Sequence, residues 1–284
     1  MTEAITSRHN PRIKLTAKLR DRRGRREQQR IIIDGVREIG RALDAGIEII
    51  ETFVCEAILS EAGCHLQQRL AATGCEIVLV NQPVLEKVAF GDRSDGIVAV
   101  AAHPQTDLSR LTVRDEMLVA VLENVEKPGN VGAVLRSADA AGVSAVIVAD
   151  AGTDLYNPNS IRASAGTIFS MPLVACSSSE ALAWLRQHAF KIVATRVDGA
   201  VDYTNMDYSG RCAVVLGNEA QGLSNAWNSA NITAVLLPMR GIGDSLNVSV
   251  TAAVLFYEAL RQRDSTTRPP WTLPPAMAAL KTLG

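Results

Sequence analysis

The chain has 284 residues, 47% of them apolar and 21% charged, which is close to average globular usage and excludes a collagen-like, coiled-coil or predominantly disordered protein. At roughly 100 to 200 residues per domain, this length favours two domains. The net charge of −1 hides an uneven distribution, because residues 1–30 carry ten Lys and Arg against three acidic residues, a local charge of +7 that leaves −8 for the rest.

The first 30 residues form a basic arm ahead of the first predicted strand. A basic segment on a mildly acidic body is typical of nucleic-acid binding, because each Lys or Arg near a phosphate releases condensed counterions. A solvated basic helix or an Arg-rich transit peptide gives the same charge pattern and stays open as an alternative. A guanidinium group can bind phosphate through two parallel hydrogen bonds, so the arginines of the arm are the candidate contacts. They are Arg20, Arg22, Arg23, Arg25 and Arg26.

Residues 31–102 alternate between short apolar runs and helix-like periodicity, which predicts one small α/β domain. Gly46 is expected to end the first helix of this domain. A polar linker that contains Pro104 follows over residues 103–115. The predicted strands cover residues 31–34, 50–54, 76–80 and 96–102.

Residues 116–263 repeat the alternation on a larger scale. Strands separated by helices predict a parallel sheet with helices on both faces. The spacing from Ser177 to Glu180 is that of a capping box and predicts the start of a helix. Residues 264–284 contain two Pro-Pro pairs and are expected to form a poorly ordered tail. The predicted strands cover residues 117–123, 144–150, 171–175, 191–196, 212–217 and 234–238, and the final helix covers about 246–263.

Three loops of the second domain follow predicted strands and carry candidate ligand-binding residues. They cover residues 124–138, 217–224 and 239–249. Each combines Gly with Asn, Glu or Ser, which allows sharp turns, close approach of a ligand to the backbone and directional hydrogen bonds. Ordinary turn chemistry explains any one of them. Because ligands bind outside the carboxyl ends of strands in open parallel sheets, the three loops together indicate a binding site.

Several other classes of protein and site are excluded. The chain has no P-loop motif, its Gly241-Ile-Gly243 lacks the third glycine of the dinucleotide motif, and its four scattered histidines do not suggest a catalytic triad. Five separated cysteines predict neither a disulfide framework nor a metal site. No apolar run approaches the roughly 18 residues that span a bilayer, and no secretory signal is evident, so we expect a soluble cytoplasmic protein. The residues alone favour an α/β transferase or a nucleotide binder.

Three segments closely resemble the three motifs of the SpoU/TrmH family of RNA ribose 2′-O-methyltransferases, in the family's order: PGNVGAVLRSADAAGV, VVLGNEAQGLS and LPMRGIGDSLNVSVTAAVLFYEAL. The N-terminal part, through SDGIVAVA, resembles that family's RNA-binding domain, and the resemblance covers about residues 5–262. It implies a small α/β RNA-binding domain followed by a methyltransferase domain with a mostly parallel sheet. It also implies that this sheet is threaded into a trefoil knot, an exception to the rule that chains do not knot.

The resemblance further implies a homodimer that binds S-adenosylmethionine, uses no metal and methylates RNA. The N-terminal domain favours ribosomal RNA over transfer RNA. The expected cofactor-binding positions are Thr195, which lies outside the three motifs, and, within the motifs, Gly217, Asn218, Gly222, Leu237, Met239, Ser245, Leu246 and Asn247. The implied catalytic positions are Arg136, Asn130, Glu219, Ser245 and Asn247. Among these, Asn130, Ser245 and Asn247 could instead form turns or cap helices, and Ser245 is well placed to cap the last helix.

The resemblance gives Arg136 the role of the base that activates the ribose hydroxyl. Removing a proton from an ordinary arginine at neutral pH costs roughly 7 kcal/mol. We therefore expect Arg136 to act as a cation that stabilises the developing alkoxide and contacts an RNA phosphate. Pairing of Arg136 with Glu219 or Asp139 is the structural alternative.

Two other classes of function stay open. An RNA-binding or ribosome assembly factor on the same fold would carry bulky or charged residues in the cofactor loops, which GNEAQGLS and SLNVS lack. A small-nucleotide binder without methyl transfer would have no use for the basic arm. Transfer RNA stays an alternative substrate.

Overall fold

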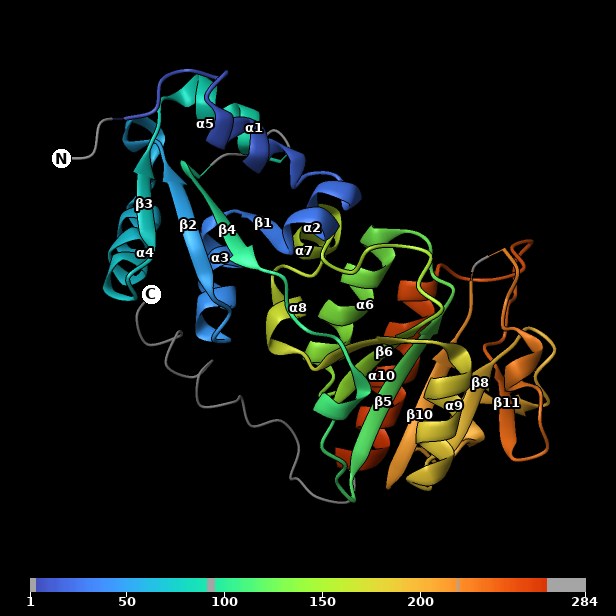
Figure 1. Cartoon of the computed structure of the whole chain (residues 1–284). Coiled ribbons are helices and arrows are strands. Elements are labelled where there is room, and N and C mark those ends of the chain that lie inside the picture. Colours follow the sequence, from blue (N-terminus) through green and yellow to red (C-terminus); the bar gives the residue numbers. More distant parts are fainter. Residues whose placement is uncertain (1–3, 91–94, 219, 265–284) are drawn as a thin grey trace.

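The computed structural model of the chain describes residues 4–90, 95–218 and 220–264. These residues form two α/β units, each built on its own β-sheet (Figure 1). The rest of the predicted tail, residues 265–284, lies outside the described residues. Within the described part, no helix is long and apolar enough to cross a membrane.

The first sheet is mixed, with strands in the order β1 (Arg30–Asp34), β4 (Ile97–Ala102), β2 (Ile49–Val54) and β3 (Glu76–Leu79). Strand β4 runs antiparallel to β1 and β2, whereas β2 and β3 are parallel. Every strand lies within one residue of its predicted bounds. Its helices and helical turn are α3 (Val36–Asp44), α4 (Glu61–Ala72), α5 (Gln82–Val88) and η1 (Glu56–Ile58).

The predicted basic arm is part of the first unit, which corrects the domain boundary at residue 30. It folds into α1 (Pro11–Lys18) and α2 (Arg22–Gln28). Ile13 and Leu19 are buried there in one apolar cluster with Phe53 of β2. The density of arginines obscured these few apolar positions, whose burial depends on the sheet beneath them.

The second sheet is fully parallel within the described residues, as the alternation of strands and helices predicted. Its order is β7-β6-β5-β10-β8-β11-β9. Sequence reasoning missed β9, because two residues are too few to show an alternating pattern. The strands are β5 (Met117–Glu123), β6 (Ala145–Ala149), β7 (Leu173–Cys176), β8 (Lys191–Thr195), β9 (Val201–Asp202), β10 (Arg211–Leu216) and β11 (Ile232–Leu236).

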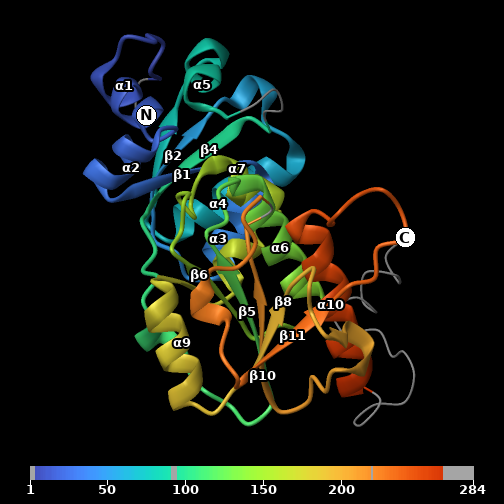
Figure 2. The same ribbon diagram turned by 90° about the vertical axis from the view of Figure 1, so that its right-hand side faces the viewer.

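Helices cover both faces of the second sheet. Figure 2 shows α9 (Ser178–Gln187) on one side and α6 (Pro128–Ala140) and α10 (Val248–Asp264) on the other. At the start of α9, the Ser177 hydroxyl accepts a hydrogen bond from the Glu180 N–H at 3.2 Å, and the Glu180 carboxylate accepts one from the Ser177 N–H at 2.8 Å. The predicted capping box is therefore confirmed.

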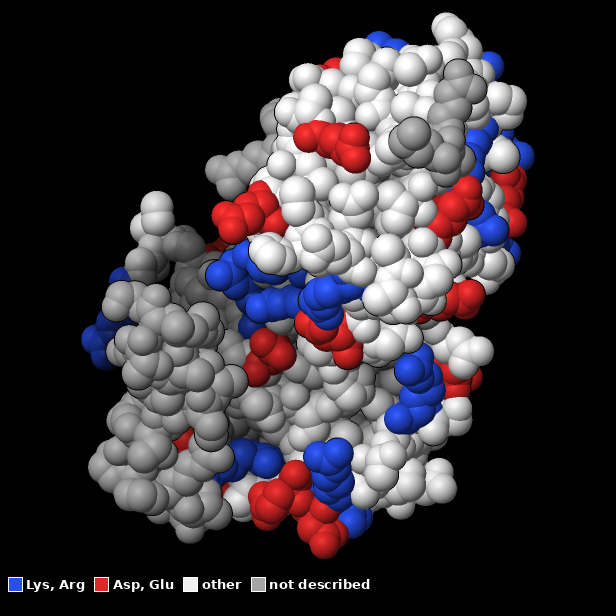
Figure 3. Space-filling model, turned by 90° about the vertical axis from the view of Figure 1, so that its left-hand side faces the viewer, with Lys and Arg blue, Asp and Glu red and all other residues white. Residues whose placement is uncertain are grey.

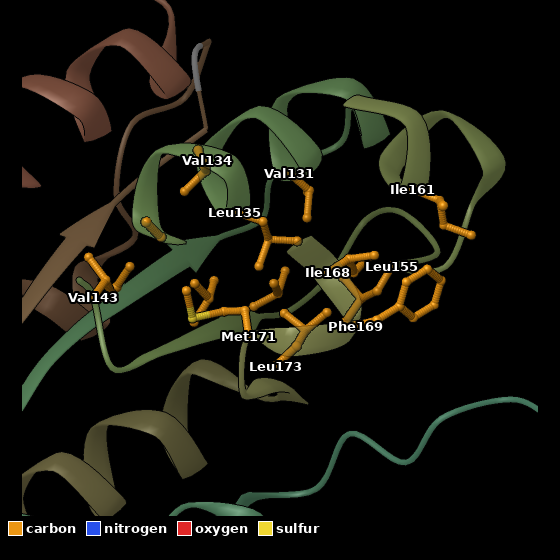
Figure 4. Packing of buried hydrophobic residues seen from close by; sticks show 14 of the residues in the cluster. Val131, Val134, Leu135, Val143, Leu155, Ile161, Ile168, Phe169, Met171 and Leu173 are labelled. Atoms are coloured by element: carbon orange, nitrogen blue, oxygen red, sulfur yellow. The ribbon is translucent and has the colours of Figure 1, made fainter. Parts of the chain in front are cut away.

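Helix α6 packs closely against α7 (Pro158–Ala163) and α8 (Thr167–Ser170). Figure 4 shows Val131 and Leu135 of α6 among apolar side chains that include Ile168 of α8. A Cβ on Gly132 would lie 2.4 Å from the Ser160 carbonyl oxygen, so the approach of α7 requires glycine at this position. This packing fixes the helix that carries two of the predicted catalytic residues.

The two units share one apolar core. A single cluster of buried side chains includes Ile31 of the first sheet and Leu118 of the second. Helix α3 lies against α8, where Arg41 Nη1 donates to the Ala165 carbonyl at 2.8 Å. Burial and hydrogen bonding therefore both hold the first unit against the second.

Candidate functional site

A cavity of about 600 Å³ opens at the carboxyl edge of the second sheet. Its walls are the segments after β8, β10 and β11, together with the first turn of α10. The volume lies within the roughly 300–1,000 Å³ of pockets that bind small molecules. Loop backbone is accompanied there by the apolar side chains of Leu216, Val235 and Leu237, so the lining suits a ligand with polar and apolar parts.

The cavity brings together most of the predicted cofactor-binding residues, because the carboxyl ends of parallel strands meet at one edge. Eight of the nine line it, and their role toward a cofactor stays a prediction. They are Thr195, Gly217, Asn218, Gly222, Leu237, Met239, Ser245 and Leu246. The ninth, Asn247, precedes α10 and is not part of the lining.

The loop that follows β10, residues 217–224 (the β10 loop), folds tightly on itself. Asn218 Oδ1 accepts hydrogen bonds from two N–H groups of this loop at 2.8 and 3.2 Å, and Asn218 Nδ2 donates to the Asn124 carbonyl at 3.0 Å. A Cβ on Gly217 would lie 2.4 Å from the carbonyl carbon of Gly222, so the turn requires glycine at residue 217. Glu219, a predicted catalytic residue, lies outside the described residues.

Asn247 connects the first and third predicted loops. Its Nδ2 donates to Asn130 Oδ1 at 3.4 Å. Its Oδ1 accepts hydrogen bonds from the N–H and hydroxyl groups of Ser249 at 2.9 and 2.7 Å. The capping role considered for Ser245 is therefore performed by Asn247, which immediately precedes α10.

Arg136 lies on α6, outside the cavity lining, with an exposed side chain. Among the described residues it forms no ion pair with Asp139, so the predicted alternative of that pairing is not seen. Asn130 lies in the first turn of the same helix and contacts Asn247. An exposed guanidinium on this helix is available to a substrate that binds on the protein surface.

Sequence reasoning missed the charged residues of the cavity lining. Arg196 and Asp198 follow β8 and form two hydrogen bonds of 2.8 Å each. The Arg196 guanidinium lowers the pKa of Asp198, which keeps this carboxylate charged. The carboxyl-edge rule would have identified Arg196, since it ends a predicted strand. Across the described ranges, no group of three or more His, Cys, Asp or Glu side chains is arranged to hold a metal ion.

Helix α2 and the turn between α1 and α2 carry the predicted RNA contacts at the surface of the first unit. Four of the five candidate arginines are exposed: Arg20, Arg22, Arg23 and Arg26. On the face drawn in Figure 3, basic side chains are interspersed with acidic ones rather than gathered in one continuous patch. Because they are exposed, the four arginines on α2 and in the turn before it remain the candidates for phosphate contacts.

Arg25 is buried, which corrects its prediction as an RNA contact. Its side chain is 1% exposed, and its Nε donates to Asp154 Oδ2 at 2.6 Å. Its Nη1 donates to the carbonyl groups of Leu19 and Arg20 at 2.7 and 2.8 Å. The periodicity of a short, arginine-rich segment could not show which of its arginines points inward.

Two family models match the chain. The SpoU rRNA Methylase family model matches residues 117–257, and the MRM3-like substrate binding domain model matches residues 10–99. The first match covers the unit that carries the cavity. The second covers most of the unit that carries the exposed arginines.

Curated and solved relatives extend over nearly the whole chain. A 23S rRNA (uridine(2479)-2′-O)-methyltransferase of Streptomyces viridochromogenes is 32% identical over 92% of this chain and 93% of its own. A crystal structure of an RNA 2′-O ribose methyltransferase is 44% identical, with a TM-score of 0.82 over 92% of this chain and 99% of that one. A structure of AdoMet-bound rRNA methyltransferase from Sinorhizobium meliloti is 27% identical, with a TM-score of 0.83 over 91% and 97% of the two chains.

Proposed function

The chain belongs to the SpoU rRNA methylase family, and we propose that it transfers a methyl group from S-adenosylmethionine to a ribose 2′-hydroxyl of ribosomal RNA. The observation that carries this proposal is the cavity built from the second and third family motifs, next to a helix that carries the first. Three of the relatives are named as 23S rRNA 2′-O-methyltransferases, which favours ribosomal over transfer RNA as the substrate.

The cavity residues fit the cofactor chemically. When bound, S-adenosylmethionine supplies an electrophilic methyl group on a sulfonium. The backbone of the β10 loop would bind its polar edges, and Leu237, Met239 and Leu246 would contact its apolar surfaces. Thr195 is held at the cavity by the hydrogen bond from its Oγ1 to the Val215 carbonyl at 2.9 Å.

Arg136 is the residue we assign to the ribose. As a cation on the surface of α6, it would stabilise the negative charge that develops on the 2′-oxygen and bind a neighbouring phosphate, while the proton passes to a phosphate or to water. Asn247 donates a hydrogen bond to Asn130 beside the cavity, and this contact supports our assignment of both residues to orienting the substrate. The catalytic assignment of Glu219 rests on the resemblance to the second motif alone.

A homodimer formed through α10 and the third loop would cover an unusual set of exposed apolar side chains. Ile242 is fully exposed, and the side chains of Val250 and Tyr257 are each 48% exposed. Met239 and Leu246, which line the cavity, are also exposed. Exposed apolar surface is a marker of protein interfaces, so we assign these side chains of the third loop and α10 to contact with the second copy. Since its substrate is ribosomal RNA, we place the protein in the cytoplasm.

The decisive experiment is methyl transfer from labelled S-adenosylmethionine to purified ribosomal RNA and, in parallel, to transfer RNA. Label that appears in ribosomal RNA as a ribose methyl resistant to alkaline cleavage would support the proposal. Label found only in transfer RNA would contradict the assignment of ribosomal RNA as the substrate. RNA binding without any transfer, despite measurable cofactor binding, would instead support an assembly factor.

A further inference from the structure

Glu123, the last residue of β5, is a buried carboxylate outside the predicted site. It is 3% exposed. Four donors bond to it: Ser178 Oγ at 2.7 Å, Ser224 N–H and Oγ at 2.7 Å each, and Trp227 Nε1 at 2.8 Å. Burying a carboxylate is unfavourable unless its hydrogen bonds are satisfied, so this arrangement is maintained by all its donors together.

The donors require an acceptor at both carboxylate oxygens. The Ser224 N–H donates to Oε2, and the Trp227 indole N–H donates to Oε1. Neither group can accept a hydrogen bond, whereas the two serine hydroxyls can reverse direction. A glutamine at residue 123 would direct its NH₂ group at one of the two N–H donors in either orientation, so only a carboxylate satisfies both.

These bonds attach the end of the β10 loop to the sheet. Ser224 is the last residue of that loop and lines the cavity. It is followed by η4 (Asn225–Trp227), whose first turn is capped by the Ser224 hydroxyl. The next residue after Glu123, Asn124, accepts the hydrogen bond from Asn218 at the start of the same loop. The end of β5 therefore holds both ends of the β10 loop.

We infer that Glu123 is a positioning residue that sets cofactor affinity by holding Ser224 and Trp227 against the end of β5. It does not line the cavity itself, so its effect passes through the β10 loop. The inference rests on the proposed function, because it concerns the same cavity.

The first test compares Glu123→Gln with wild type by calorimetry with S-adenosylmethionine. A buried N–H donor left without an acceptor should open the loop and weaken cofactor binding about ten-fold or more. The KM for RNA should change less than about two-fold, since the RNA contacts lie on other elements. Equal cofactor affinity in a folded Gln variant would overturn the inference. Absence of binding to wild type would instead contradict the proposed function.

A compensating change separates positioning from general stability. The double variant Glu123→Gln/Trp227→Phe lacks the indole N–H that donates to Oε1. The glutamine can then direct its carbonyl oxygen at the Ser224 N–H and its NH₂ group at the two serine hydroxyls. Cofactor affinity should recover by about three-fold or more relative to Glu123→Gln, although the smaller phenyl ring leaves part of the buried Trp227 site unfilled and lowers the melting temperature. A merely structural role predicts further loss of affinity in the double variant.

Two serines provide a matched pair that does not depend on the Gln variant folding. Ser178 Oγ and Ser224 Oγ both donate to Glu123 Oε1 at 2.7 Å. Ser178 belongs to α9, which contributes no described residue to the cavity. Ser224→Ala should weaken cofactor binding about three-fold or more. The fold-change in cofactor affinity caused by Ser178→Ala should be less than half of the fold-change caused by Ser224→Ala. Equal effects of the two changes would overturn the inference.

Discussion

The Nε of Arg25 donates to Asp154 Oδ2 at 2.6 Å, and this ion pair joins α2 of the first unit to the segment before α7 of the second. The side chains are 1% and 13% exposed. Helix α7 in turn packs on α6, which carries Asn130 and Arg136. An arginine from the most basic part of the chain is therefore an internal contact between the two units.

Arg25→Met should destabilise the protein by about 3 kcal/mol, because removal of one partner leaves Asp154 with an uncompensated charge in a largely buried position. Thermal or urea unfolding measures this loss. Arg23→Met is the control, since Arg23 pairs with Glu27 in solvent and should leave stability unchanged. Similar stability of the two variants would show that the buried pair contributes nothing.

The exposed arginines of α2 and of the turn before it should determine the salt dependence of RNA binding. Changing Arg20, Arg22, Arg23 and Arg26 to Gln should weaken binding and reduce the slope of log affinity against log salt by up to about 0.7 to 0.9 for each phosphate that is no longer neutralised. Substitution is the correct test, because deleting residues 1–30 would also remove the buried Ile13 and Leu19. Filter binding at several salt concentrations measures the slope, which a purely solvated surface would leave unchanged.

Arg136→Ala should abolish methyl transfer and keep cofactor affinity within about three-fold, since Arg136 lies outside the cavity lining. Arg136→Lys should be nearly as damaging, because an ammonium group cannot replace the planar, two-point contact of a guanidinium. Single-turnover assays and calorimetry measure the two quantities separately. Near wild-type turnover in either variant would contradict the assigned role.

Stability should fall with rising pH through the titration of Asp34. Burial raises the pKa of Asp34 to about 6, against the opposing hydrogen bond from the Phe90 N–H. The folded protein then binds this proton more tightly than the unfolded chain, so the associated stability is present below about pH 4 and is lost as pH rises through about 6. The loss amounts to at most about 3 kcal/mol.

Asp34→Asn removes this titration and still accepts the Phe90 hydrogen bond. The stability of the variant relative to wild type should therefore rise between pH 4 and pH 6 and remain constant above, as measured by urea unfolding at several pH values. A difference that does not depend on pH would show that Asp34 titrates normally in the folded state.

Local patterns in the sequence determined the three loops and the described strands other than β9. Each strand of the first sheet was predicted within one residue, because runs such as Ile31–Ile33 are apolar whatever they pack against. The convergence of the second and third loops followed from one rule, that ligands bind at the carboxyl edge of a parallel sheet. The resemblance to the motifs added which residues of those loops line the cavity, and the trefoil knot that it implies stays a prediction.

Tertiary structure determined the features that depend on contacts between residues distant in the chain. Arg25 and Arg26 are indistinguishable in sequence, yet Arg25 is buried because Asp154, 129 positions away, meets it at the junction of the two units. Glu123 likewise ends an ordinary strand, and its donors Ser224 and Trp227 lie 101 and 104 positions away. A buried charge is stable only where folding supplies its partners, and no local pattern records which distant residues those will be.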